Sequence, residues 1–111
     1  MYSKNLIKGT LQTIILKQLE ENGRMYGYEI TQKVKEISDG KIEITEGALY
    51  PTLHKLEAEG VVTTEKEFIG KRVRKYYTLT PSGNKVTSEK SIELADFIAT
   101  ISQILQPKPS V

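Results

Sequence analysis

The sequence predicts an α+β fold, mostly helical, with three helices first, then a β-hairpin, then one long C-terminal helix. Two observations predict this order. Apolar residues recur at helical spacing as far as Gly60, and β-branched residues then alternate with polar ones until Thr80 opens a new helical pattern. At 111 residues, the chain is long enough for one compact domain and too short for two.

Apolar spacing and glycine stops mark the first three helices. The first is expected from Leu6 to Glu21, before Gly23, and the second from Tyr26 to Ile37. The third is expected from an N-cap at Thr45 to a stop at Gly60. Only a short connection separates the second helix from the third.

The β-hairpin and the last helix follow. Strands are expected over residues 61–66 and 73–79, with residues 67–72 between them. Thr80 is a suitable N-cap and the following proline suits the first helical position, so a fourth helix is expected to run to Leu105. This is the element order of a winged helix-turn-helix, expected over residues 1–80. Residues 81–105 then form a C-terminal helix, and residues 106–111 a flexible tail.

The third helix has an unusual outward face. Leu49, Leu53 and Leu56 fall on one side and are expected in the core. Pro51 lies past the first turn, where proline costs up to about 3 kcal/mol in a regular helix. A solvated face is one explanation; the other is a face that approaches DNA closely. The residues expected to contact DNA from this helix are Gly47, Tyr50, Pro51, His54 and Lys55.

Positive charge is concentrated on the hairpin. The formal net charge is +2, whereas residues 66–77 hold five Lys or Arg and one Glu, a net +4, which leaves −2 for the remainder. Basic edge strands also deter aggregation, so a solvated edge is the alternative to phosphate contact. The residues expected to contact DNA here are Lys71, Arg72, Arg74 and Lys75, with Arg72 and Arg74 the best candidates.

The fourth helix is longer than a small domain can cover. Its 25 or so residues span roughly 37 Å at 1.5 Å per residue, and apolar side chains lie on more than one side. The first helix is also apolar around more than half of its circumference. A symmetric dimer is therefore expected. The residues expected at its interface are Leu11, Ile15, Leu94, Phe97, Ile98, Ile101, Ile104 and Leu105.

Three blocks, in order, resemble the PadR family of transcriptional regulators. They are residues 26–30 (YGYEI), 46–60 (EGALYPTLHKLEAEG) and 74–83 (RKYYTLTPSG), and the similarity extends over about residues 6–105. The resemblance implies a homodimeric repressor that binds a palindromic operator in double-stranded DNA. It also implies a small hydrophobic effector at the dimer interface. Some relatives bind flat drugs there on a tryptophan, which this chain lacks. The comparable ligand residues would be Phe97, Ile101 and Asp96.

Other classes of function lack support. The chain has no Cys and one His, and it shows no glycine-rich phosphate loop or metal-ligand spacing, so we expect no enzyme, metal or cofactor. No apolar run approaches the roughly 20 residues of a membrane span, and a cytoplasmic protein is expected. A winged helix that binds protein, or one that binds RNA, stays open as an alternative.

Overall fold

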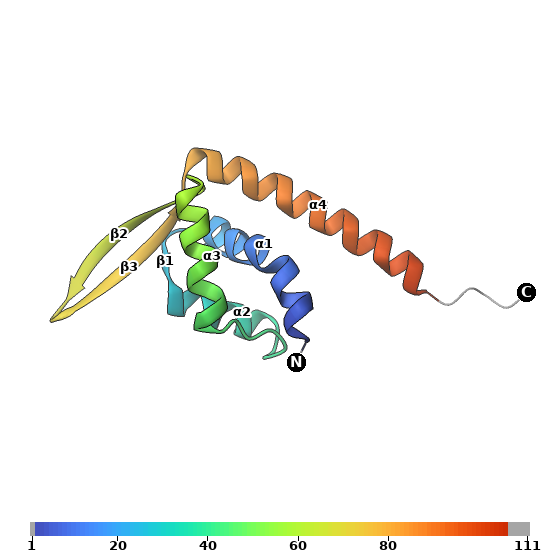
Figure 1. The fold of residues 1–111 in the computed structure, drawn as a ribbon, viewed down its shortest axis with the longest axis horizontal. Coiled ribbons are helices and arrows are strands. Elements are labelled where there is room, and N and C mark those ends of the chain that lie inside the picture. Colours follow the sequence, from blue (N-terminus) through green and yellow to red (C-terminus); the bar gives the residue numbers. More distant parts are fainter. Residues whose placement is uncertain (1, 107–111) are drawn as a thin grey trace, which may run out of the picture.

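A computed structural model describes residues 2–106 and has the expected order of elements. Along the chain these are α1 (Lys4–Asn22), β1 (Met25–Tyr26), α2 (Gly27–Ile37), α3 (Glu46–Ala58), β2 (Val62–Ile69), β3 (Arg72–Leu79) and α4 (Pro81–Leu105). Three helices, a β2–β3 hairpin (the wing) and a long last helix confirm the winged helix-turn-helix (Figure 1). Of the expected tail, residues 107–111 lie outside the described part of the chain.

The sheet has one strand more than the sequence predicts. β1 pairs antiparallel with β3, so the strand order is β1-β3-β2, with Met25 opposite Tyr77 and Tyr26 opposite Tyr76. The prediction that the second helix begins at Tyr26 is therefore wrong by one residue, because Tyr26 belongs to the sheet and precedes the helix. Its backbone N–H donates to the Glu29 carboxylate at 3.1 Å. Two residues are too few to show strand alternation in a sequence.

The wing is longer than expected. β2 and β3 pair without interruption out to Ile69 and Arg72, which leaves only Gly70 and Lys71 as the turn. Gly70 has φ +62°, the left-handed conformation that glycine adopts without strain, at the first position of a two-residue turn. The expected six-residue connection is thus mostly strand, and the wing projects away from the helices (Figure 1).

Helix α1 lies at the centre of the hydrophobic core. Leu11, Ile15, Leu16 and Leu19 are all at most 4% exposed. The expectation that Leu11 and Ile15 belong to a dimer surface is therefore wrong, because the protomer itself covers them. α1 is apolar on several sides since α2, α3, β3 and α4 all pack against it.

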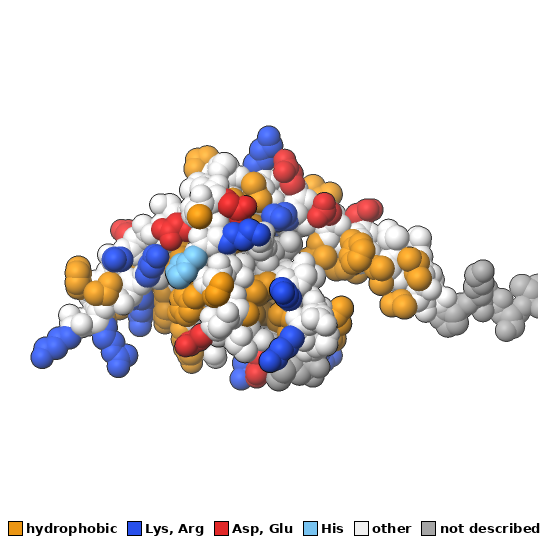
Figure 2. Space-filling view, in the orientation of Figure 1, with side chains coloured by type: hydrophobic (Ala, Val, Ile, Leu, Met, Phe, Trp, Pro, Cys, Tyr) orange, Lys and Arg blue, Asp and Glu red, His pale blue; other side chains and the backbone are white. Residues whose placement is uncertain are grey.

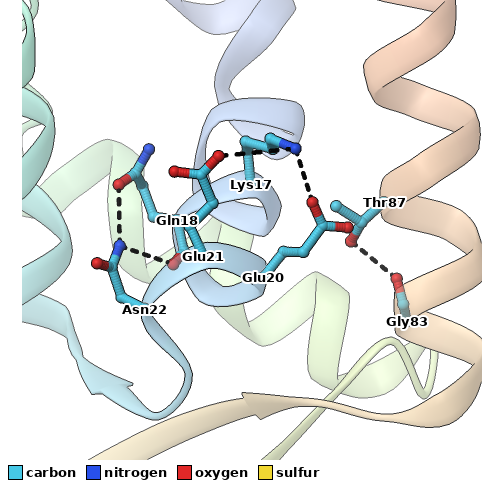
Figure 3. A network of polar contacts seen from close by, with 7 residues as sticks. All are labelled: Lys17, Gln18, Glu20, Glu21, Asn22, Gly83 and Thr87. Atoms are coloured by element: carbon cyan, nitrogen blue, oxygen red, sulfur yellow. Dashed lines mark hydrogen bonds and ion pairs between the residues drawn. The ribbon is translucent and has the colours of Figure 1, made fainter.

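The wing leads into α4 through a tightly packed junction. The Gly83 N–H donates to the Thr80 hydroxyl oxygen at 3.0 Å, which caps α4, and the Thr80 hydroxyl contacts the Gly60 carbonyl at 2.7 Å. A Cβ atom at Gly83 would overlap the Val61 carbonyl oxygen, so only glycine fits there. The Thr87 hydroxyl donates back to the Gly83 carbonyl at 2.8 Å, beside α1 (Figure 3). α4 is thereby fixed at its start, while its far end extends beyond the other helices (Figure 1).

Candidate nucleic-acid interface

Helix α3 presents the outward face that the sequence predicts. The Ala48 N–H donates to the Thr45 side chain at 3.2 Å and caps the helix, and three leucines, each at most 1% exposed, anchor it. Pro51 lies inside the helix, where it cannot donate to the Gly47 carbonyl. The five residues expected on the outward face are all exposed: Gly47, Tyr50, Pro51, His54 and Lys55.

The Tyr50 side chain packs against the start of α2. A Cβ atom at Gly27 would lie 2.7 Å from the Tyr50 hydroxyl oxygen and 3.0 Å from the ring carbon that bears it. The side chain therefore rests against the α2 backbone with 37% of the residue exposed. This contact gives Tyr50 a fixed direction on the surface, and glycine at position 27 is what makes room for it.

Two hollows flank α3, so the helix stands as a ridge between them. The first, of about 540 Å³, lies between α3 and the wing, and both Tyr50 and His54 line it together with Arg72, Arg74 and Lys75. The second, of about 380 Å³, lies on the α1 side and includes Gly47, Pro51, Lys4 and Lys8. A protruding helix with basic side chains on both sides is the shape that the DNA major groove accepts.

Part of the wing's positive charge is neutralised within the protein. Lys75 lies 3.3 Å from the Glu57 carboxylate of α3, and the Thr64 hydroxyl donates to the same carboxylate at 2.9 Å. The Thr64 hydrogen bond and then Lys75 hold the pKa of Glu57 below its usual value. Lys75 thus joins the wing to α3, which makes it a weaker candidate for phosphate contact than the sequence indicates.

A row of two arginines with two tyrosine rings between them lies where β3 pairs with β1. Arg24 lies over the Tyr76 ring at 3.9 Å, Tyr76 meets Tyr26 edge to face at 5.5 Å, and Arg74 lies over the Tyr26 ring at 4.0 Å. Arg24 also lies 2.8 Å from Glu67 and 3.4 Å from Glu65 on β2. The hydrogen bond to Glu67 is the largest influence raising the pKa of Arg24. These contacts set the angle between the wing and the helices.

The sequence could not reveal most of this row. Tyr26 enters the sheet through a two-residue strand, so its proximity to Tyr76 follows from β1–β3 pairing that no pattern indicates. Arg24 belongs to a loop, where single basic residues are common. Tyr28, 62% exposed at the start of α2, also lines the hollow between α3 and the wing and is a further candidate that the sequence did not single out.

The fold and this surface define a winged helix-turn-helix DNA-binding protein. The transcriptional regulator PadR-like family matches residues 15–89, which is most of the chain. The chain belongs to this family of transcriptional regulators. It is accordingly a DNA-binding regulator and not an enzyme.

Relatives and solved structures agree with that assignment. The transcriptional regulator Rv3488 of Mycobacterium tuberculosis is 36% identical over 75 residues, which are 68% of this chain and 66% of that protein. A transcriptional regulator from Clostridium thermocellum superposes with a TM-score of 0.85 at 31% identity, covering 96% of this chain and all of the other. A PadR family regulator from Eggerthella lenta gives 0.77 at 30% identity, covering 94% and 88%. The fold thus matches over nearly the whole chain.

Two further findings concern other chemistry. Among the helices of residues 2–106, none combines the length and apolarity that a membrane crossing requires. The same residues contain no cluster of three or more His, Asp or Glu side chains placed to hold a metal ion.

Proposed function

We propose that this regulator is a cytoplasmic repressor that binds a palindromic operator as a homodimer through α4. The observation that carries the proposal is the apolar surface of the last helix. Phe97 is 58% exposed, Ile98 56%, Ile104 71% and Leu105 75%. Contiguous apolar side chains at such exposure mark an interaction site. A second copy of the same helix has the matching surface.

A groove beside α4 supports the same partner. It has a volume of about 350 Å³, and its walls come from α1, α2 and α4, including Ile14, Ile37, Leu94 and Ile98. Ile37 lines the groove and is 62% exposed. Ser91 also lines it, and its buried hydroxyl has no hydrogen-bond partner within residues 2–106. The far part of a partner's α4 would cover this apolar groove. Leu94, Phe97, Ile98, Ile101, Ile104 and Leu105 are the proposed interface residues of α4.

A two-fold dimer also suits the reading of DNA. Two copies of α3 about 34 Å apart reach successive major-groove turns on one face of a duplex, so each copy reads one half of a palindrome. In this arrangement α3 supplies base contacts through Tyr50 and His54, with Gly47, Pro51 and Lys55 on the approaching face. Arg72, Arg74 and Lys71 of the wing supply phosphate contacts.

The proposed effector is a small hydrophobic molecule that binds between the subunits. Asp96, Phe97 and Ile101 were its expected contacts, but none of them lines the groove beside α4 in a single protomer. The site would therefore be complete only in the dimer. Its ligand would act by binding one spacing of the two α3 helices more tightly than the other.

Sedimentation equilibrium tests the dimer directly. We expect the protein to be dimeric at micromolar concentration and Phe97→Glu to be monomeric, because a carboxylate in an apolar interface is strongly disfavoured. Ile69→Glu, a matched change of an exposed apolar residue on the wing, is the control and should stay dimeric. A dimeric Phe97→Glu variant, or a monomeric wild-type protein, would refute the proposed interface.

Selection of bound duplexes from a random-sequence pool tests the operator. Repeated enrichment with the purified protein is expected to return an inverted repeat whose half-sites are about 10 base pairs apart, centre to centre. A reporter gene carrying that repeat in its promoter should be expressed less when the protein is present. Enrichment of no common sequence, or of a single unrepeated site, would contradict the proposed palindrome.

A further inference from the structure

The outer end of the hairpin, residues 66–73, is unusually apolar for a protruding tip; we call it the wing tip. Phe68 is 79% exposed, Val73 53% and Ile69 44%. Strand pairing places Phe68 directly opposite Val73, so the two side chains form one apolar patch on a single face. The first buried residue of β3 is Tyr77, five residues after the strand begins at Arg72 near the tip. The patch therefore contributes little to the core.

Cations surround this apolar patch. Lys66, Lys71 and Arg72 belong to the wing tip, and within residues 2–106 none of them takes part in an ion pair. Figure 2 shows hydrophobic and basic side chains together at the outer end of the wing. The one acidic residue of the wing tip, Glu67, is paired with Arg24, and nearer the base of the wing Lys75 is paired with Glu57 of α3. A matching partner must offer an apolar slot between negative charges.

We propose that Phe68 enters the minor groove of the bound duplex and wedges into a base step, while Lys71 and Arg72 contact the flanking phosphates. The proposal rests on the proposed function and deepens it, since it makes the wing tip a device that bends the operator. Duplex DNA meets the requirement because stacked bases are apolar and phosphates line both edges of the groove. Proteins that kink DNA insert apolar side chains such as Phe into the minor groove in this way.

The reach of the wing suits this role. The five residue-to-residue steps from Tyr77 to Arg72 extend roughly 17 Å at about 3.3 Å per step, whereas the minor groove is about 7.5 Å deep. Ile69 and Val73 of the wing tip line the same hollow between α3 and the wing as Tyr50 does. The apolar tip is thus continuous with the face that reads DNA. This continuity favours DNA over a lipid surface as the partner.

A tryptophan at the tip reports base stacking. The chain contains no tryptophan, so Phe68→Trp introduces the sole strong fluorophore at the proposed wedge. Addition of the most enriched 30-base-pair duplex from the selection should quench its emission severalfold, because stacked bases quench indole fluorescence. The matched control is Ile92→Trp on α4, at a position that is 68% exposed and outside the proposed interface, and the duplex should leave its emission nearly unchanged.

The affinity for DNA and its dependence on salt distinguish the contribution of Phe68 from that of the basic side chains. Phe68→Ala should bind the same duplex about tenfold more weakly, in the range found for lost stacking on a base, with an unchanged slope of log affinity against log salt. Lys71→Ala should lower that slope by about one. Phe68→Ala should also reduce the bend of the duplex, measured by the mobility of circularly permuted fragments. Circular dichroism should show both variants folded, because both side chains are exposed.

Three outcomes overturn the proposal. The first is unchanged affinity and bending in Phe68→Ala, and the second is unquenched emission from Phe68→Trp on a duplex that the variant binds. The third is quenching by anionic phosphatidylglycerol vesicles in place of the duplex, which assigns the wing tip to membranes. In each case the wild-type protein still binds its operator. Failure of the wild-type protein to bind any selected duplex is a different result and refutes the proposed function itself.

Discussion

The guanidinium carbon of Arg74 lies 4.0 Å from the centre of the Tyr26 ring, so a basic side chain of the wing is held against the residue that precedes α2. Its position is therefore set by two elements and not by the hairpin alone. A guanidinium stacked by its face keeps its N–H groups free at the edge, where they can reach a phosphate. This arrangement lets one side chain both orient the wing and contact DNA.

Arg74→Ala should weaken binding to every duplex sequence alike. Loss of one phosphate contact lowers the slope of log affinity against log salt by about one, and fluorescence anisotropy over a salt series measures it. Arg74→Lys, the matched variant, keeps the charge and should keep the slope. If the slope of Arg74→Ala equals that of the wild-type protein, Arg74 is a positioning residue for the wing and not a phosphate contact.

Tyr50→Ala should lower operator affinity about 5- to 100-fold without unfolding the protein, since the side chain is 37% exposed on the reading face. Gly27→Ala probes the same side chain from its other side, because the new methyl group would displace the Tyr50 hydroxyl. Affinity should fall in this variant too. Equal operator affinity in a folded Tyr50→Ala protein would remove the residue from the interface.

Gly47→Ala should change the stability of the fold and the affinity for DNA in opposite directions. A Cβ atom at Gly47 has open space for 4 Å around it, and alanine favours a helix over glycine by up to about 1 kcal/mol. We expect a higher melting temperature together with weaker operator binding, because the added methyl group lies on the approaching face. Gly83→Ala, where the methyl group meets the Val61 carbonyl, should instead destabilise the fold by about 1–3 kcal/mol. Undiminished operator affinity in Gly47→Ala would show that the DNA does not approach this residue closely.

The contact of Glu57 with Thr64 and Lys75 predicts that the stability of the folded protein depends on pH in the acidic range. The pKa of Glu57 is lowered in the folded state, so its stabilising contribution is complete above the usual carboxyl value of about 4.3 and is lost as the pH falls through the lowered value. Glu57→Gln should therefore be less stable than the wild-type protein in urea at pH 7, and the difference between the two should be smaller at pH 3. An equal difference at both pH values would mean that the carboxylate charge is not what joins α3 to the wing.

The helices and the reading face could be predicted because each depends on local signals. Leucine spacing in α3 determines which side chains are buried, and thereby places Tyr50 and His54 on the surface. The N-caps at Thr45 and Thr80 could also be predicted, because threonine is a preferred N-cap residue. The wing is longer than the sequence predicts. Phe68 and Ile69 fall in the expected connection between the strands, but in the structure they pair with Val73 and Arg72 and so extend β2.

What could not be predicted depends on contacts between distant segments. The apolar circumference of α1 predicts a dimer surface at Leu11 and Ile15, yet the protomer itself buries both side chains, since α2, α3, β3 and α4 all pack against α1. The pairing of Lys75 with Glu57 likewise joins residues 18 apart, because the wing packs against α3. A count of charges along the wing therefore overstated the number available to DNA.

The most direct measurement is the mass of the complex between the protein and its selected 30-base-pair duplex, by sedimentation velocity. The account predicts one species with two chains per duplex, and a Phe97→Glu protein that binds the same duplex far more weakly. A complex of one chain per duplex, formed equally well by the wild-type and Phe97→Glu proteins, would contradict it.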